Sequence, residues 1–389
     1  MSPLRYRLLR RLRDEGPVSR AELAARLDVP RSRLAGELET LHDDGLIREA
    51  GLAASRGGRR SPLIELAPDL RLAAVDLGAT SLDVAITNGM LEPVASYSEA
   101  VDIREGPRTL LRRVNELLAK ARADGAYDRL LAIGIGIPGP VSYRDGVPIA
   151  PPIMPGWDHY PIREQLGRDH GCPVAVDNDV NIMAIGERHG GVSRSVDTVL
   201  FVKIGTGIGC GIHIDGKVFR GPDGCAGDIG HIQVDPDGLP CSCGNIGCLE
   251  AHFGGSALTR DALAAARDDS SPALAARLAE AGTVTPLDVA EGAAAGDLVC
   301  IALVRDGGHR LGVVLAGLVS FINPSMIVIG GGLAGLGHIL LAELRSVVYR
   351  RSLPMATGNL PVVLSELGSS AGVIGAAVLA SDLAYGQPS

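Results

Sequence analysis

Three cysteines and one histidine are the residues whose types and spacing most clearly specify chemistry. Cys241, Cys243 and Cys248 lie close together in a glycine-rich stretch, and His231 precedes them. Three thiolates and one imidazole complete a tetrahedral shell for Zn²⁺, and a shell with no open position is typical of a structural metal. Three unliganded core cysteines are the alternative, but they would leave a polar loop without apolar support. The pattern therefore predicts a structural zinc site formed by His231, Cys241, Cys243 and Cys248.

Two acidic residues flank these predicted ligands. Asp228 lies three residues before His231, and Glu250 lies two residues after Cys248. A metal ion would hold two carboxylates and one edge of an imidazole beside each other, and such a set of hydrogen-bonding groups matches the hydroxyls of a sugar ring. We therefore expect Asp228, His231 and Glu250 to contact a sugar.

A second polar cluster follows a short apolar run. Residues 174–176 predict a buried strand, and Asp177, Asn178, Asp179 and Asn181 come soon after it. Polar groups after a buried strand are where α/β folds place ligands. Asp179 would accept the proton of a sugar hydroxyl as a general base, and Asn178 would fix that hydroxyl. The alternative is a turn that caps a helix starting near residue 182, and Asn181 fits that role better than Asn178 or Asp179 does.

Two strand–turn–strand segments resemble each other and suggest a duplicated fold whose turns face each other across a cleft. They span residues 72–88 and 198–214, and a third segment, the apolar run 326–329, ends in three glycines. Glycine amides in such turns approach phosphate oxygens. A hairpin also needs glycine for conformational reasons alone, so present-day ATP binding stays open. The expected phosphate or nucleotide contacts are Asp76, Gly78, Thr80, Gly205, Thr206, Gly207, Gly330 and Gly331.

The first 70 residues predict a separate DNA-binding head. Leucines at helical spacing stop at Gly16, Ser19 and Glu22 form a capping box for a second helix, and a third helix begins near Arg31. A strand pair with a basic loop at its tip follows. This order is typical of a winged helix-turn-helix that acts as a dimer, and a small protein-binding helical domain is the alternative. The expected DNA contacts are Arg31, Ser32 and Arg33 at the start of the third helix, and Arg56, Arg59 and Arg60 in the loop.

Charge and length agree with a basic head on an acidic body. The chain has 389 residues and a net charge of −8, and residues 1–66 carry 13 Arg and no Lys against 10 Asp and Glu. The remainder carries 24 basic and 35 acidic residues, so the two segments contribute +3 and −11, which sum to −8. The length predicts two or three domains, and the lack of a long apolar run or a signal-like N-terminus predicts a soluble, cytoplasmic protein without membrane contact. The other cysteines, Cys172, Cys210, Cys225 and Cys300, are expected to be packing residues.

The motifs together resemble the ROK family of repressors, open reading frames and kinases. The resemblance rests on C-x-C-G-x-x-G-C-x-E at residues 241–250, G-x-x-G-H at residues 227–231, the Asn-Asp pair at residues 178–179 and D-x-G-x-T at residues 76–80. It implies an actin- and hexokinase-like α/β domain of two lobes, and kinases of the family phosphorylate hexoses or N-acyl hexosamines with ATP and Mg²⁺. By resemblance, Asp179 is the catalytic base, and Asn178, His231 and Glu250 hold sugar hydroxyls.

Departures from the family pattern weaken the case for a kinase. D-x-G-G-T-K is changed at Ala79 and Ser81, the Glu of E-x-G-H is Asp228, and the Asn of P-N-L-P-G-W is Ile153. A methyl group then stands where backbone would meet phosphate, and a lysine is absent. Kinases of the family generally lack a winged helix and repressors possess one, so the head also favours a regulator.

We therefore predict a winged helix-turn-helix at residues 1–70, a first ROK lobe at residues 71–190 and a second lobe with the zinc box at residues 191–371. A C-terminal helix at about residues 372–389 is expected to pack back on the first lobe. The predicted function is a sugar-responsive regulator, most simply a repressor, that binds operator DNA as a homodimer or homotetramer and takes a hexose or hexose derivative as effector. The rivals are an ATP- and Mg²⁺-dependent hexose or N-acylhexosamine kinase with a DNA-binding head, and a DNA-binding protein with a vestigial sugar site.

Overall fold

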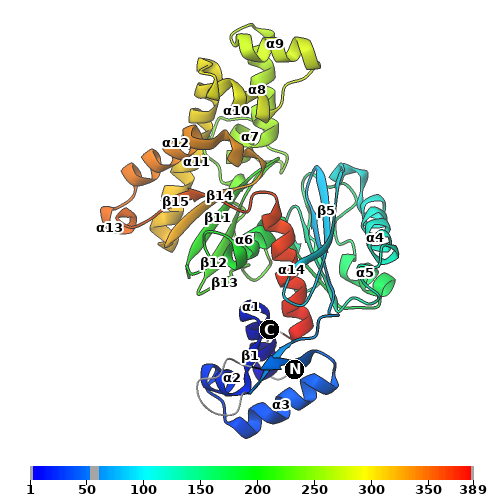
Figure 1. Ribbon diagram of the computed structural model, residues 1–389. Coiled ribbons are helices and arrows are strands. Elements are labelled where there is room, and N and C mark those ends of the chain that lie inside the picture. Colours follow the sequence, from blue (N-terminus) through cyan, green and yellow to red (C-terminus); the bar gives the residue numbers. More distant parts are fainter. Residues whose placement is uncertain (1–2, 53–60, 387–389) are drawn as a thin grey trace.

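The computed structural model describes residues 3–52 and 61–386, which form a small head and two larger lobes (Figure 1). The head lies at one end of the molecule, and the C-terminal helix α14 (Ser370–Tyr385) runs from the lobes toward it. The expected DNA contacts Arg56, Arg59 and Arg60 lie outside the described residues.

The head packs three helices against a three-stranded sheet. Its second helix begins with the predicted capping box, because Ser19 Oγ accepts a hydrogen bond from the Glu22 amide and the Glu22 carboxylate accepts one from the Ser19 amide. Leucines from all three helices fill one core. The elements are α1 (Pro3–Glu15), β1 (Val18–Ser19), α2 (Arg20–Leu27), α3 (Arg31–Asp43), β2 (Ile47–Leu52) and β3 (Pro62–Leu66), with the strand order β1-β3-β2. This arrangement confirms the predicted winged helix-turn-helix.

A five-stranded sheet in the order β10-β7-β4-β5-β6 forms the centre of the first lobe. β4, β5 and β6 form an antiparallel meander, whereas β7 and β10 continue the sheet in parallel with β4. Side chains alternate along β4: Val75 and Leu77 pack with α4 and α5, and Ala74 packs with α14. The elements are β4 (Leu72–Leu77), β5 (Ser81–Thr87), β6 (Pro93–Ala100), η1 (Ile103–Glu105), α4 (Pro107–Ala123), β7 (Ala132–Ile137), β8 (Val141–Ser142), β9 (Val147–Pro148), α5 (Ile162–His170) and β10 (Val174–Asn178).

The second lobe repeats this topology with a sheet in the order β13-β12-β11-β14-β15. β11, β12 and β13 again form an antiparallel meander, and β14 and β15 run parallel to β11. The elements are β11 (Val199–Ile204), β12 (Ile208–Ile214), β13 (Lys217–Val218), η2 (Ile229–His231), α7 (Leu249–Phe253), α8 (Gly255–Arg267), α9 (Pro272–Ala281), α10 (Pro286–Ala294), α11 (Leu298–Ile322), β14 (Met326–Gly330), η3 (Gly332–Leu336), α12 (Gly337–Arg351), α13 (Pro354–Thr357) and β15 (Val362–Leu364). The repeat confirms the predicted two-lobed α/β fold.

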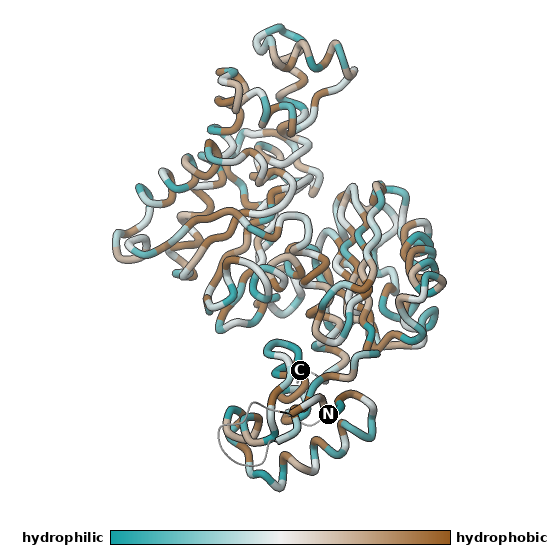
Figure 2. The backbone as a smooth tube through the Cα atoms, viewed as in Figure 1, coloured by the Kyte–Doolittle hydropathy of each residue, from teal (hydrophilic) through white to brown (hydrophobic). Residues whose placement is uncertain are grey.

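Apolar residues gather along the central strands of both sheets, and the outer face of α4 in the first lobe is largely hydrophilic (Figure 2). This distribution is the one expected when each sheet buries both of its faces under helices. None of the helices in the described part of the chain combines the length and the apolar composition that crossing a membrane requires.

Helix α6 (Asp179–Gly190) lies between the two sheets. Ile182 packs with the first sheet, and Met183 packs with the second. Helix α14 packs directly on α6: a Cβ atom on Gly186 would lie 2.0 Å from Ala371 O, and one on Gly375 would lie 1.6 Å from Ile182 O. Because only glycine fits at both positions, the backbones of the two helices are in contact.

The head is attached to the lobes through the end of α14. Arg13 of α1 donates a hydrogen bond to Asp382 Oδ1 at 2.8 Å, and its side chain is only 3% exposed. Burial raises the pKa of Asp382, and Arg13 opposes that shift. Tyr385 is buried within the head's own hydrophobic core. The last turns of α14 are therefore part of the head as well as of the lobes.

Replacing Arg13 with Met should lower the free energy of unfolding by about 3 kcal/mol, because Asp382 would stay buried without its partner. Arg10→Met is the matched control on the same helix: its ion pair with Asp14 is exposed, so its loss should cost at most about 0.5 kcal/mol. Urea unfolding followed by circular dichroism measures both values. Equal effects of the two substitutions would show that the buried pair does not stabilise the junction.

Candidate functional site

One large cleft, of about 1160 Å³, is lined by both lobes. Gly330 does not line it: this residue packs at the end of β14, where an added Cβ would lie 2.5 Å from the Phe201 ring. Gly330 therefore serves the packing of the sheet, contrary to the nucleotide contact expected of it. The cleft brings together the other residues predicted to contact a sugar or nucleotide, which are Asp76, Gly78, Thr80, Asn178, Asp179, Gly205, Thr206, Gly207, Asp228, His231, Glu250 and Gly331.

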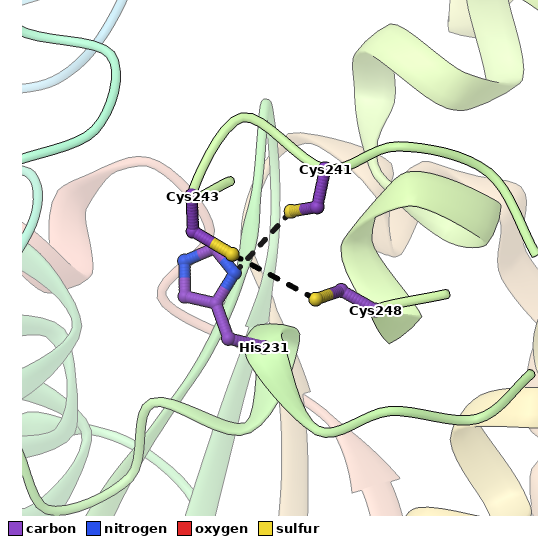
Figure 3. A group of neighbouring side chains, drawn as sticks. All are labelled: His231, Cys241, Cys243 and Cys248. Atoms are coloured by element: carbon purple, nitrogen blue, oxygen red, sulfur yellow. Dashed lines mark hydrogen bonds between the residues drawn. The ribbon is translucent and has the colours of Figure 1, made fainter. Parts of the chain in front are cut away.

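The four predicted zinc ligands converge beside this cleft (Figure 3). Their ligand atoms all lie within 4.8 Å of one another. Cys241 Sγ lies 3.5 Å from His231 Nδ1, and Cys243 Sγ lies 3.8 Å from Cys248 Sγ. A tetrahedral zinc ion with Zn–S bonds of about 2.3 Å and Zn–N bonds of about 2.0 Å needs S–N and S–S separations of about 3.5 and 3.8 Å. The donor set therefore fits a zinc ion.

The loop that carries the cysteines has a backbone that only glycine adopts easily. Gly244 and Gly247 have φ angles of +89° and +72°, and a Cβ on Gly247 would lie 1.5 Å from Asp235 O. Burial and the neighbouring thiols raise the pKa of Cys248 to about 12, so this sulfur would stay protonated unless a cation lay beside it. Of the remaining cysteines, Cys225 is exposed, which corrects the expectation that it is a packing residue.

Two carboxylates accompany the cysteine cluster, as expected from their spacing. His231 turns Nδ1 toward Cys241, and its other nitrogen, Nε2, lies 3.9 Å from Asp228 Oδ1. Glu250 Oε2 accepts a hydrogen bond from the Ile208 amide at 3.2 Å. Burial raises the pKa of both carboxyl groups. One wall of the cleft thus combines an imidazole edge with two carboxyl groups.

The start of α6 differs from expectation in one respect. Asn178, not Asn181, caps the helix: its Oδ1 accepts hydrogen bonds from two free amides of the first turn at 2.8 and 3.3 Å. Its Nδ2 donates to Gly139 O at 2.7 Å. The polar atoms of the Asn178 side chain are therefore hydrogen-bonded to the backbone. Asp179, by contrast, contacts another side chain of the cleft.

Lys203 is a cleft residue that the sequence analysis missed. It comes from β11 of the second sheet, and its Nζ forms an ion pair with Asp179 Oδ2. Burial lowers the pKa of Lys203, but Asp179 and Asp76 raise it by more, so the ammonium stays charged. A signal was available, because the chain has only three lysines and this one interrupts an apolar strand just before a glycine turn. A charge inside a buried strand requires a partner.

Asp76 lies in the cleft near the end of β4. Burial raises its pKa to about 7, Lys203 opposes the shift, and Asp179 and Asp83 add to it. A Cβ atom on Gly372 would lie 1.8 Å from Asp76 Oδ2, so the first turn of α14 lies directly against this carboxyl group. At neutral pH, Asp76 is therefore only partly ionised.

The two glycine turns offer fewer free amides than their sequences suggest. The Gly78 amide donates to Ser81 O at 2.8 Å, and the Gly205 amide donates to Gly207 O at 2.9 Å. At the second turn, a Cβ on Gly207 would lie 2.1 Å from Glu250 Oε2. Two of the expected phosphate contacts, the Gly78 and Gly205 amides, are thus engaged within their own turns, and a carboxylate lies against the second turn.

The start of α3 carries the exposed basic residues expected for DNA contact. Arg31, Ser32 and Arg33 are all exposed. Arg20, elsewhere in the head, pairs with Glu49 at 2.9 Å. By contrast, within the described residues no hydrogen bond or ion pair engages the side chain of Arg31 or Arg33. Both arginines are therefore available to phosphates or base edges.

Comparison with known proteins accounts for nearly the whole chain. The ROK family matches residues 72–383, and a helix-turn-helix domain matches residues 1–50. A xylose repressor from Caldicellulosiruptor bescii is 30% identical, and the match covers 97% of this chain and 95% of the repressor.

Solved structures give the same division. A ROK family transcriptional regulator, described as a homolog of the E. coli MLC protein, superposes with a TM-score of 0.84 at 26% identity, covering 98% of this chain and 96% of that one. A ROK family glucokinase from Streptomyces griseus, in complex with glucose and AMPPNP, has a TM-score of 0.71 at 30% identity. That match covers 80% of this chain and 99% of the glucokinase. Similarity to regulators thus extends over the head and both lobes.

We expect purified protein to carry one zinc ion per chain, and Cys243→Ser to lose it and to lower the unfolding temperature by more than about 5 °C. Cys225→Ser is the matched control, because this exposed thiol lies outside the cluster. Elemental analysis after dialysis and scanning calorimetry measure the two effects. Wild-type protein without zinc, or full zinc content in Cys243→Ser, would contradict the assignment.

Asp76→Asn should stabilise the protein at pH 8 by about 1–2 kcal/mol and have little effect near pH 4. The folded-state pKa of about 7 lies above the ordinary value of 3.8, so the folded protein retains a proton that the unfolded chain releases. The free energy of unfolding of the wild type therefore falls as the pH rises from about 4 to about 7, because Asp76 must ionise while it is buried. An Asn side chain does not ionise, so the variant does not lose this stability. Urea unfolding across this range measures the difference, with the exposed Asp128→Asn as control. The same pH profile in both variants would contradict the shifted pKa.

Proposed function

The chain belongs to the ROK family and is a transcriptional regulator, and we propose that a small sugar in the cleft controls how tightly the head holds operator DNA. The observation that carries the proposal is the course of α6, which begins at Asp179 in the cleft and approaches the head at its other end through His189. A ligand and the DNA-binding head therefore act on the same helix.

We propose that the sugar lies between the cysteine cluster and the start of α6. Asp228, His231 and Glu250 provide hydrogen-bonding groups on one side, and Asp179 provides a carboxylate on the other. Sugar hydroxyls both donate and accept hydrogen bonds, so a wall of polar groups suits them. The names of two similar proteins, a xylose repressor and a glucokinase solved with glucose, support a sugar here.

We propose a structural zinc ion at the cysteine cluster. His231, Cys241, Cys243 and Cys248 would fill all four tetrahedral positions. When bound, zinc supplies a cross-link and no reactive water, because no coordination position stays open. His231 and the two flanking carboxylates are then held in the orientation that a sugar requires.

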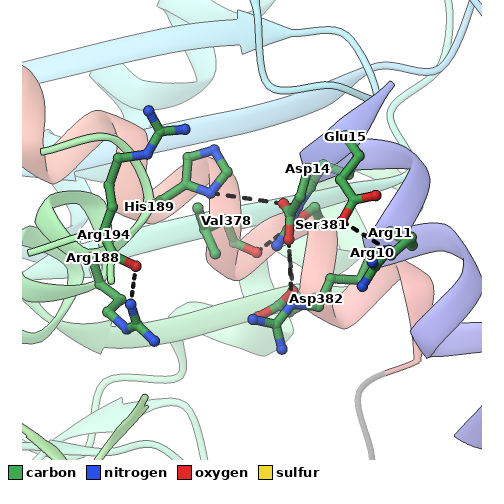
Figure 4. A network of polar contacts seen from close by, with 11 residues as sticks. Arg10, Arg11, Asp14, Glu15, Arg188, His189, Arg194, Val378, Ser381 and Asp382 are labelled. Atoms are coloured by element: carbon green, nitrogen blue, oxygen red, sulfur yellow. Dashed lines mark hydrogen bonds and ion pairs between the residues drawn. The ribbon is translucent and has the colours of Figure 1, made fainter. Parts of the chain in front are cut away.

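Two helices that begin at the cleft, α6 and α14, both reach α1 of the head, and Figure 4 shows their contacts with it. His189, near the end of α6, lies 3.9 Å from Asp14 of the head. α14 begins against Asp76 in the cleft, and its far end carries Asp382, which pairs with α1. A sugar that binds one placement of these helices more tightly shifts the population of head placements, whereas equal affinity for both would shift nothing.

We propose that Arg31 and Arg33 reach the major groove and that the chain binds DNA as a homodimer or homotetramer. One helix-turn-helix reads too few base pairs for useful specificity, and a dimer presents two such helices to half-sites about one helical turn apart. Arg56, Arg59 and Arg60 would add contacts to phosphates.

An ATP- and Mg²⁺-dependent sugar kinase is the second candidate, because Asp179 and both glycine turns are present in the cleft. The ion pair between Asp179 and Lys203 argues against it. A general base must be free to take a proton, and Asp179 Oδ2 is engaged by the Lys203 ammonium.

The test is operator binding by zinc-loaded, full-length protein, with DNA selected from a random library and a panel of pentoses, hexoses, N-acyl hexosamines and their phosphates. At least one sugar should change the dissociation constant for DNA by about tenfold, a coupling of about 1.4 kcal/mol. Asp179→Asn should abolish this response and retain DNA binding. Arg33→Ala should weaken DNA binding about tenfold or more and retain sugar binding.

A coupled assay with ATP, Mg²⁺ and the same sugars distinguishes the two candidates. Turnover of about 1 per second or faster, lost in Asp179→Asn, would favour the kinase. DNA binding that no sugar alters would contradict the regulator proposal.

A further inference from the structure

The proposed function leaves open which class of sugar the cleft takes. We infer that the cleft binds an uncharged sugar, with no phosphate group, nucleotide or divalent metal ion. The Lys203 ammonium and the Asp179 carboxylate already neutralise each other, so the ammonium is not available to a phosphate and the carboxylate is not available to a divalent ion. This inference rests on the proposed function and names the effector class of that same site.

Acidic side chains outnumber basic ones in the cleft wall. The acidic lining residues are Asp76, Asp83, Asp102, Asp179, Asp228 and Glu250. The basic ones, within the described part of the chain, are Arg104, Lys203 and the proposed zinc ligand His231. Arg104 pairs with Asp102 at 2.6 Å, so it brings no unpaired charge. A phosphate dianion would therefore enter a field of its own sign.

Lys203 is the cation that lies deepest among these carboxylates. Its Nζ pairs with Asp179 Oδ2 and also interacts electrostatically with Asp76. Carboxylates such as these two are the ligands by which proteins hold Mg²⁺ next to a nucleotide. With the ammonium of Lys203 in place, a divalent ion would meet a positive charge where it requires negative ones. Lys203 thus balances the charge of Asp179, and no metal ion is needed for that purpose.

The Glu250 carboxylate lies against the second glycine turn. The Ile208 amide donates to Glu250 Oε2 at 3.2 Å, and this oxygen lies 2.1 Å from the position of a Cβ on Gly207. The Gly205 amide is used within the turn. Amides of a glycine turn bind phosphate only when they point at it unengaged. The Gly205 and Ile208 amides are both engaged within the protein and are therefore not free for a phosphate.

The first test uses Mn²⁺ as a paramagnetic probe on zinc-loaded, full-length protein. Wild type should hold no Mn²⁺ in the cleft with a dissociation constant below about 1 mM, and calorimetry should detect no Mg–ATP binding at similar concentrations. Lys203→Met keeps the side-chain length and removes the charge, so Mn²⁺ should bind about tenfold tighter or more. Adding Asp179→Asn to this variant should remove the gain. Lys217→Met, an exposed lysine of the same sheet, should behave as wild type.

Two results of this test would overturn the inference. One is submillimolar Mn²⁺ or Mg–ATP binding by wild type that Asp179→Asn abolishes. The other is a folded Lys203→Met variant with no gain in Mn²⁺ affinity. If Lys203→Met does not fold, the wild-type titration decides by itself.

The second test compares each neutral sugar with its phosphate in the operator assay. We expect a neutral sugar to shift DNA affinity at about tenfold lower concentration than its phosphate does, or lower. A response to a sugar phosphate but not to the neutral sugar would overturn the inference and leave the proposed function intact. A response to neither would contradict the proposed function, and the Mn²⁺ titration would still decide whether the cleft excludes metal.

Discussion

The ion pairs at the start of α6 are the constraint on which the rest of the structure depends. Asp179 pairs with Lys203, and Asp177, which is 1% exposed, pairs with Arg220 at 2.6 Å. Asp177 lies in β10 of the first lobe and Asp179 begins α6 directly after that strand, whereas both cations come from the second lobe. Separating a buried pair leaves uncompensated charge, which is strongly unfavourable. The two pairs therefore tie the start of α6 to the second lobe.

Most of the fold could be predicted from the sequence because its signals are local. Ser19 and Glu22 cap α2 through backbone amides only a few residues away, and the apolar runs that became β4 and β11 need no knowledge of their neighbours. The cysteine spacing likewise encodes a cluster within one loop, with His231 as the single distant member. Local rules and the tertiary structure agree at these places, which is why the head, the duplicated lobes and the four-residue cluster could be anticipated.

The details of the cleft could not be predicted, because they are set by partners that are distant in sequence. The helix begins at Asp179 rather than near residue 182, so the amides that need a cap are those beside Asn178, and Asn181 turns to Asp177 instead. Lys203 finds its carboxylate on another element of the other lobe. Gly330 packs against the Phe201 ring at the end of β14, whereas the next residue, Gly331, lines the cleft. A shift of one residue along a strand changes which side chain faces the cleft, and the spacing of residues in the sequence does not reveal that shift.

A regulator and a kinase can share these lobes, because the difference between them lies in charge and attachment rather than in topology. Lys203 places a charge of the protein beside Asp179, where a kinase needs the charge of its metal ion. The attachment of the head adds the second difference. The contact of Gly186 with α14 leaves no room for a side chain, and packed interiors transmit displacement instead of absorbing it. This contact therefore joins α6, which begins at Asp179 in the cleft, to the helix whose last turns are part of the head.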